Sequence, residues 1–209
     1  MIEDEIRNAY QAHWLARESG ARPWLADQPE PMPNATFQTW VQGRGVPPRY
    51  LDEVLVGFRE TPPVTEVRAF MADPARSLLL LIGSRGVGKT IAASFAAVRW
   101  LGRYVLAAEV SQVYRELHCR EMVRAWCSMG LLVIDELGRE PTDMDQRSRA
   151  TMWEVVERRY AARRKTILVS NMPEKFLRER YDEPMWDRIS GDGGVFPVVG
   201  ASLRQRGAA

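Results

Sequence analysis

The sequence has few of the residues that build disulfide frameworks and metal centres. Its 209 residues include two cysteines and two histidines. Cys119 and Cys127 do not form a CxxC motif, and His118 beside Cys119 falls short of the four ligands of a structural zinc site. We therefore expect both thiols to be reduced, as is typical of cytosolic proteins.

Long hydrophobic runs and an excess of one charge are also missing. No stretch approaches the roughly 18 apolar residues of a membrane span, and the acidic start, residues 3–5, is unlike a secretory signal. We predict a cytoplasmic protein with no membrane partner. Because 29 basic residues nearly balance 27 acidic ones, any surface that binds nucleic acid must be a local cluster.

A glycine-rich loop, the Walker A pattern, directly follows the apolar run 78–82 and precedes an alanine-rich segment typical of a helix. Such a loop binds a triphosphate through backbone N–H groups at a helix N-terminus, with a lysine for the β and γ phosphates and a hydroxyl for Mg²⁺. We predict that this loop binds ATP and Mg²⁺, with Thr90 as a metal ligand. The predicted contacts are Gly83, Ser84, Arg85, Gly86, Val87, Gly88, Lys89, Thr90 and Ile91.

The chain divides best at the proline-rich segment 29–34, which suits an extended linker. Residues 1–27 have apolar and aromatic side chains at near-helical spacing, which indicates either a docking helix or a helix packed on its own domain. We predict an N-terminal helical element with its linker over 1–34 and a nucleotide-binding domain over 35–209.

Beyond residue 62, helix and strand patterns alternate as in a wound α/β domain. Nearly continuous apolar runs are typical of parallel strands buried on both faces. We predict a five-stranded parallel sheet flanked by helices, without a separate C-terminal helical lid. The expected strands are 78–82, 103–108, 131–135, 166–170 and 195–199, and the expected helices are 64–73, 89–101, 111–127, 145–163 and 173–180.

Two carboxylates, Asp135 and Glu136, end the predicted strand 131–135, where ligands of open α/β sheets bind. This is a Walker B pattern. We predict that Asp135 holds Mg²⁺ through water and that Glu136 orients and polarises the attacking water. Asn171 ends a further strand, where it either contacts the γ phosphate or the lytic water, or serves as a turn or N-cap residue before Pro173. Spacing alone does not single out Arg188 or Arg204 among the arginines of the chain.

Seven segments occur in an order that resembles the DnaC/IstB family of AAA+ ATPases. The resemblance covers about residues 43–206 and implies a P-loop fold of the AAA+ type. It also implies that Asn171 is sensor 1, Arg188 a trans-acting arginine finger and Arg204 a sensor 2-like arginine, although Leu203 replaces the aromatic residue that usually precedes that arginine. The segments are 45–50, 83–90, 132–138, 158–160, 166–171, 187–189 and 200–204.

The predicted helix 111–127 falls where the family inserts a helix that lines the path of single-stranded DNA. Arg120 and Arg124 share a helical face, and Arg115 lies to one side. These arginines either contact DNA phosphates, which gives salt-dependent affinity, or lie on the solvated face of an ordinary helix.

The resemblance implies an ATPase that loads a replicative hexameric helicase onto single-stranded DNA and self-associates into rings or helical filaments. An IstB-like helper of a transposase shares every motif. A P-loop nucleotide kinase is a more remote alternative, because no arginine-rich lid is found and Glu136 has little use in a kinase. A module that binds ATP without hydrolysing it is the last alternative.

Overall fold

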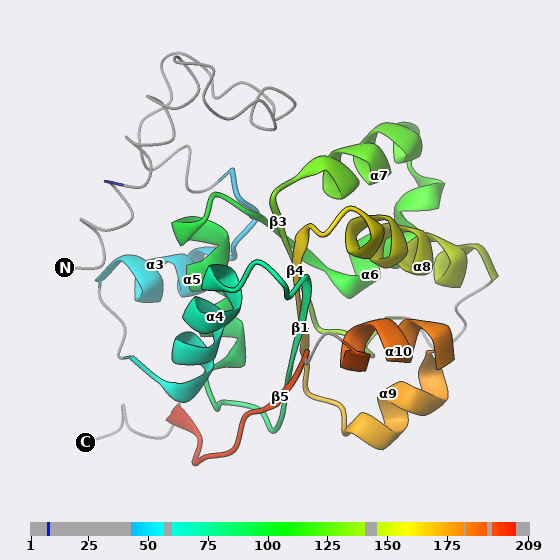
Figure 1. Cartoon of the computed structure of the whole chain (residues 1–209). Coiled ribbons are helices and arrows are strands. Elements are labelled where there is room, and N and C mark those ends of the chain that lie inside the picture. Colours follow the sequence, from blue (N-terminus) through cyan, green and yellow to red (C-terminus); the bar gives the residue numbers. More distant parts are fainter. Residues whose placement is uncertain are drawn as a thin grey trace.

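The computed structural model describes Asn8 and residues 43–56, 60–140, 146–181, 183–191 and 194–203. A central sheet separates two layers of helices (Figure 1). The predicted N-terminal element 1–34 lies outside the described residues, apart from Asn8. In the described part of the chain, no helix is both long and apolar enough to cross a bilayer.

Five parallel strands form the sheet in the order β2-β3-β4-β1-β5. The predicted five-stranded parallel sheet is therefore confirmed. Two strands are shorter than expected: β2 ends at Leu106, where α6 begins directly afterwards, and β5 ends at Pro197. The strands are β1 (Leu78–Ile82), β2 (Arg103–Leu106), β3 (Leu131–Asp135), β4 (Lys165–Ser170) and β5 (Val195–Pro197).

Each face of the sheet carries its own hydrophobic core, because successive side chains of a strand point to opposite faces. On β1, Leu79 and Leu81 pack with one core, whereas Leu78 and Leu80 pack with the other. The first core is covered by α3 (Pro48–Val56), α4 (Pro62–Ala72) and α5 (Lys89–Arg99). The second is covered by α6 (Ala107–Gln112), α7 (Cys119–Ser128), α8 (Gln146–Ala161), α9 (Glu174–Arg180) and α10 (Glu183–Gly191).

The prediction of one continuous helix over 111–127 is wrong. The segment holds α6, a 3-10 turn η2 (Val113–Arg115) and the separate helix α7. Helix α6 starts early because the Glu109 carboxylate accepts a hydrogen bond from the backbone N–H of Leu106, 3.3 Å away, at the helix start. Glu116 takes an extended backbone (φ −82°, ψ 148°), which ends the turn before α7. Arg115 and Arg120 therefore lie on different elements.

Residues just before α3 run along the edge of β2. The backbone N–H of Tyr104 donates to the carbonyl of Arg44 at 2.8 Å. Gly45 has a φ of +81°, and a Cβ there would lie 2.4 Å from the carbonyl oxygen of Tyr104. Only glycine fits this position. This edge contact brings Pro47 and α3 beside the carboxyl end of the sheet.

Arg159 joins α8 to the neighbouring elements from within the core. It is fully buried, and its guanidinium donates to Thr166 Oγ1 and to the carbonyl oxygens of Trp126, Met129 and Lys165. Burial lowers the pKa of Arg159 to about 9. The side chain thus supplies hydrogen-bond donors to three backbone carbonyl groups from within the core.

We expect Arg159→Met to destabilise the fold by about 3 kcal/mol, because it leaves three carbonyl oxygens without this donor. Thermal unfolding should then shift down by about 6–12 °C. Arg158→Met is the matched control, since Arg158 is exposed and forms an i,i+4 pair with Glu154. Equal melting temperatures for the two variants would contradict the structural role of Arg159.

Candidate nucleotide-binding site

The glycine-rich loop joins the end of β1 to the start of α5. Gly86 and Gly88 have φ values of +85° and +94°, in the left-handed region that favours glycine. Gly88 is the N-cap of α5, so the free N–H groups of the first turn of this helix lie beside the loop. This is the arrangement that binds phosphate groups.

Lys89 turns its ammonium group into the loop. The residue is buried, and Nζ donates to the carbonyl oxygens of Gly83 (2.8 Å) and Ser84 (2.6 Å) and to Oδ1 of Asn171 (2.8 Å). Asn171 reaches Lys89 because β4, which ends just before it, pairs with β1. The N-cap of α9 is Pro173, so Asn171 does not fill that alternative role.

Asp135 lies at the end of β3 and is nearly inaccessible, at 2% exposed. Burial raises the pKa of its carboxyl group, while hydrogen bonds from Tyr104, the Glu136 backbone and the Thr90 side chain act in the opposite direction. The structure therefore brings Thr90 and Asp135 into contact. Their hydroxyl and carboxylate are oxygen ligands of the kind that Mg²⁺ prefers, and a cation would offset the buried charge.

Glu136 points its carboxylate toward the same cleft from the loop after β3. Its φ of +59° is unusual for a residue with a side chain and marks a constrained backbone of the kind found at functional sites. Oε1 of Glu136 accepts a hydrogen bond from Arg139 Nη1 at 3.1 Å. Its carboxylate is therefore held near the end of β3 but remains partly exposed.

These groups line a cavity of about 550 Å³ at the carboxyl end of the sheet. That volume is in the range of small-molecule sites. It is lined by Pro47, Arg49, Tyr50, Glu53, Arg85, Gly86, Gly88, Lys89, Thr90, Ile91, Tyr104, Leu106, Asp135, Glu136, Arg139, Asn171 and Leu203.

The chain after β5 crosses the glycine-rich loop. The N–H of Leu203 donates to the carbonyl of Gly86 at 2.8 Å, and the Ser202 side chain lies against the same glycine. Arg204, the predicted sensor 2-like residue, follows directly but lies outside the described residues.

Arg188 lies away from these groups, on α10. Its Nε donates to Glu157 Oε2 at 3.3 Å, and its guanidinium carbon lies 5.3 Å from the centre of the Tyr160 ring. Both partners belong to α8. Arg188 is not among the residues that line the nucleotide cleft.

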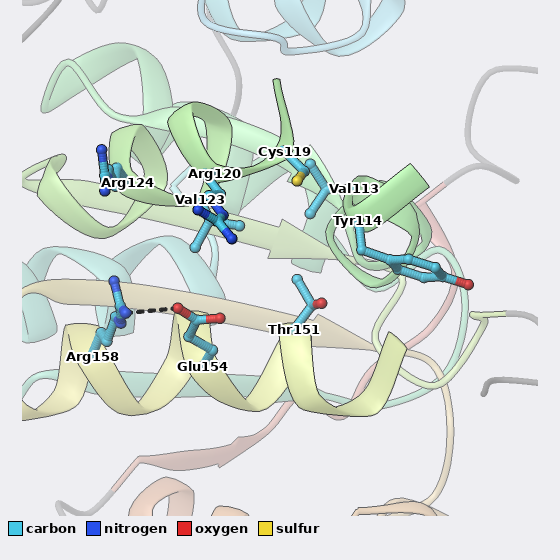
Figure 2. A pocket seen from close by; sticks show the side chains of 9 residues that line it. All are labelled: Val113, Tyr114, Cys119, Arg120, Val123, Arg124, Thr151, Glu154 and Arg158. Atoms are coloured by element: carbon cyan, nitrogen blue, oxygen red, sulfur yellow. Dashed lines mark ion pairs between the residues drawn. The ribbon is translucent and has the colours of Figure 1, made fainter. Parts of the chain in front are cut away.

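Arg120 and Arg124 line a second cavity, of about 360 Å³, between η2, α7 and α8. Figure 2 shows Arg158 and Glu154 of α8 facing the α7 arginines. Arg158 and Glu154 are joined by a 2.8 Å ion pair. Arg115, the third predicted DNA contact, instead donates from Nε to the hydroxyl of Tyr114 at 3.0 Å. The structure thus groups two of the three arginines and adds Arg158.

Sequence reasoning missed Tyr104 and Arg139. Tyr104 lies on β2, where an aromatic residue reads as core, and only the pairing of β2 with β3 brings its hydroxyl to Asp135. Arg139 lies three residues after Glu136, and this short spacing is the signal by which the contact was detectable.

Residues 66–208, more than half of the chain, match the family of IstB-like ATP-binding proteins. The chain belongs to this family. A further relative is the YdaV protein of Escherichia coli K12, which is 26% identical over 122 residues. That match covers 54% of this chain and 48% of YdaV, so the chain matches about half the length of this relative. The chain is therefore a DnaC/IstB-like AAA+ protein, and members of this family bind nucleotide.

Solved structures agree with this family in fold. A DnaC helicase loader superposes with a TM-score of 0.57 at 18% identity, over 73% of this chain and 100% of that one. AMPPCP-bound DnaA from Aquifex aeolicus superposes with a TM-score of 0.59 at 18% identity, over 76% of this chain and 53% of that one. A putative primosome component from Streptococcus pyogenes superposes with a TM-score of 0.58 at 15% identity, over 81% of this chain and 100% of that one. They establish the P-loop AAA+ fold of the IstB-like chain.

We expect Lys89→Ala to abolish detectable ATP binding, because it removes the ammonium group that donates to the carbonyl oxygens of Gly83 and Ser84 within the glycine-rich loop. Titration with a fluorescent ATP analogue measures the effect. Lys175→Ala is the control, since Lys175 is an exposed lysine of α9 that does not line the cleft. Binding by Lys89→Ala at wild-type affinity would contradict the assignment of the loop.

Proposed function

We propose that this protein is an ATPase that uses ATP binding and hydrolysis as a switch while it loads a ring helicase onto single-stranded DNA. The observation that carries the proposal is the second cavity, which Arg120, Arg124 and Arg158 line away from the nucleotide cleft. Arginines grouped in this way suit a phosphate backbone. The fold shared with a structure named as a helicase loader supports the proposal.

At the nucleotide cleft, each residue has a separate task. Lys89 and the N–H groups of the loop bind the β and γ phosphates, and Asn171 orients Lys89 through its 2.8 Å hydrogen bond. Thr90 and Asp135 would hold Mg²⁺, which neutralises phosphate charge when it is bound. Glu136 accepts a hydrogen bond from the attacking water and aligns it with the γ phosphate.

Hydrolysis in this proposal requires a neighbouring subunit. Arg188 lies on α10, outside the cleft of its own chain, so it reaches the γ phosphate only of an adjacent copy. Such a head-to-tail contact produces rings or open helical assemblies. Arg204, beyond the crossing at Gly86, is proposed as a further phosphate contact in cis.

The DNA-binding step is tested by the salt dependence of binding to labelled single-stranded oligonucleotides. We expect Arg120→Ala combined with Arg124→Ala to weaken binding and to flatten the plot of log affinity against log salt by about 0.7 per lost phosphate contact. Arg178→Ala is the control, because Arg178 lies on α9 and pairs with Glu174. An unchanged salt slope in the double variant would count against this DNA path.

The partner is tested by affinity capture with Glu136→Gln protein held in ATP and Mg²⁺, with Lys89→Ala as the control bait. Recovery of a hexameric helicase, lost when residues 1–27 are deleted, is the expected result. The family match to IstB-like proteins favours a second candidate, an ATP-dependent helper of a transposase. Recovery of a transposase in place of a helicase would establish that role.

A further inference from the structure

Strand pairing brings the hydroxyl of Tyr104 to the carboxylate of Asp135. In the parallel register, Leu106 lies opposite Asp135 and Tyr104 lies two residues earlier, on the same face of the sheet. Diagonal neighbours of this kind are within reach of an aromatic side chain. Tyr104 spans the gap, and its hydroxyl donates to Oδ2 of Asp135 at 2.5 Å.

The contact between Tyr104 and Asp135 is buried, and each of the two residues is also fixed by further hydrogen bonds. Tyr104 is 3% exposed and Asp135 is 2% exposed. The Tyr104 backbone is held by Arg44 through the edge contact at Gly45. Asp135 also accepts hydrogen bonds from the Glu136 N–H, at 2.6 Å to Oδ1, and from Thr90.

Three donors thus occupy most of the roughly four lone-pair positions of one carboxylate. The carboxylate has little freedom to rotate. Because Tyr104 binds Oδ2 from the sheet, the remaining acceptor capacity is directed to the side of Thr90 and the glycine-rich loop. A phenylalanine would pack equally well at this position but would leave Oδ2 without that donor.

We propose that Tyr104 is a positioning residue for cation-dependent nucleotide binding, and that it acts by fixing the orientation of Asp135. This inference rests on the proposed function, in which Asp135 holds the cation. Partners that orient metal ligands typically contribute about 10- to 100-fold to metal affinity. The hydroxyl of Tyr104, rather than its ring, carries the effect.

The test is a titration of nucleotide binding with Mg²⁺, which does not require hydrolysis, DNA or a protein partner. A fluorescent ATP analogue is bound to the full chain at increasing Mg²⁺ and, separately, in EDTA. We expect Tyr104→Phe to raise the Mg²⁺ concentration for half-maximal binding by about tenfold. Binding in EDTA should stay within about twofold of the wild type, because the ring and the glycine-rich loop remain in place.

Tyr114→Phe is the matched control. Tyr114 lies on η2 and lines the second cavity, and its hydroxyl accepts a hydrogen bond from Arg115 Nε rather than reaching the cation site. This variant should leave the Mg²⁺ requirement unchanged. Asp135→Asn shows how large the effect is when Mg²⁺-dependent binding is lost completely. Thermal melts in EDTA show that each variant is folded.

Two results would overturn the inference. One is an unchanged Mg²⁺ requirement in Tyr104→Phe, and the other is an equal loss of binding in Mg²⁺ and in EDTA, which would mean that Tyr104 only packs. If the wild-type protein binds nucleotide equally with and without Mg²⁺, the proposed cation chemistry fails first and this inference falls with it.

Discussion

Replacing Arg188 by alanine should leave ATP binding intact and lower stimulated ATP hydrolysis by about 10³-fold, at the lower end of what arginine fingers contribute. The reason is that Arg188 lies outside the nucleotide cleft of its own chain. Arg188 lies on α10, where Glu157 and Tyr160 of α8 hold it, and the nucleotide cleft of the same chain is lined by other residues. Phosphate release with single-stranded DNA, at protein concentrations that permit assembly, measures the loss.

A mixing experiment separates action between subunits from damage within one subunit. Arg188→Ala keeps an intact nucleotide site, whereas Lys89→Ala lacks that site but retains Arg188. We expect neither variant to hydrolyse ATP well alone and an equimolar mixture to regain a substantial part of the activity. Arg178→Ala, on the adjacent helix α9, serves as the control and should behave as the wild type. Full stimulation in Arg188→Ala alone would refute the finger assignment.

The second large effect is expected at Glu136. Glu136→Gln should bind ATP and Mg²⁺ as tightly as the wild type, while hydrolysis falls by about 10²- to 10³-fold, since the amide no longer polarises the attacking water. The substitution preserves shape, so the contact with Arg139 and the φ of +59° are compatible with it. Rapid chemical quench of a single turnover measures the step directly.

The matched control for this change is Glu174→Gln, which removes one charge from an exposed ion pair on α9. It should turn over normally. A Glu136→Gln protein that hydrolyses ATP as fast as the wild type would contradict the proposed role of Glu136 in polarising the attacking water.

The sequence predicted those parts of the site whose residues lie within one short segment of the chain. The glycine-rich loop needs left-handed residues at Gly86 and Gly88 and a cation at its end, and each requirement is met within eight residues. Asp135 likewise ends an apolar strand whose burial follows from its composition. Local constraints of this kind are readable without an alignment, because the conformation and the chemistry reside in the same segment.

Contacts between distant segments were not readable in this way. Tyr104 and Asp135 are 31 positions apart, and their meeting depends on which strand lies beside β3 and in which register. The break of the expected 111–127 helix into α6, η2 and α7 was missed for a related reason. Neither glycine nor proline marks it, and packing against α8 decides where the arginines lie.

The sequence by itself determined that this chain has a P-loop, a buried acidic strand end and the order of elements of a wound α/β domain. Its periodicity and its turn residues act over a few positions, which suffices for such local features. Only the tertiary structure decided that Lys89 meets Asn171, that the Tyr104 hydroxyl meets Asp135 and that Arg188 does not line the cleft. Those juxtapositions depend on strand order and helix packing, which are set by the burial of the two cores as a whole.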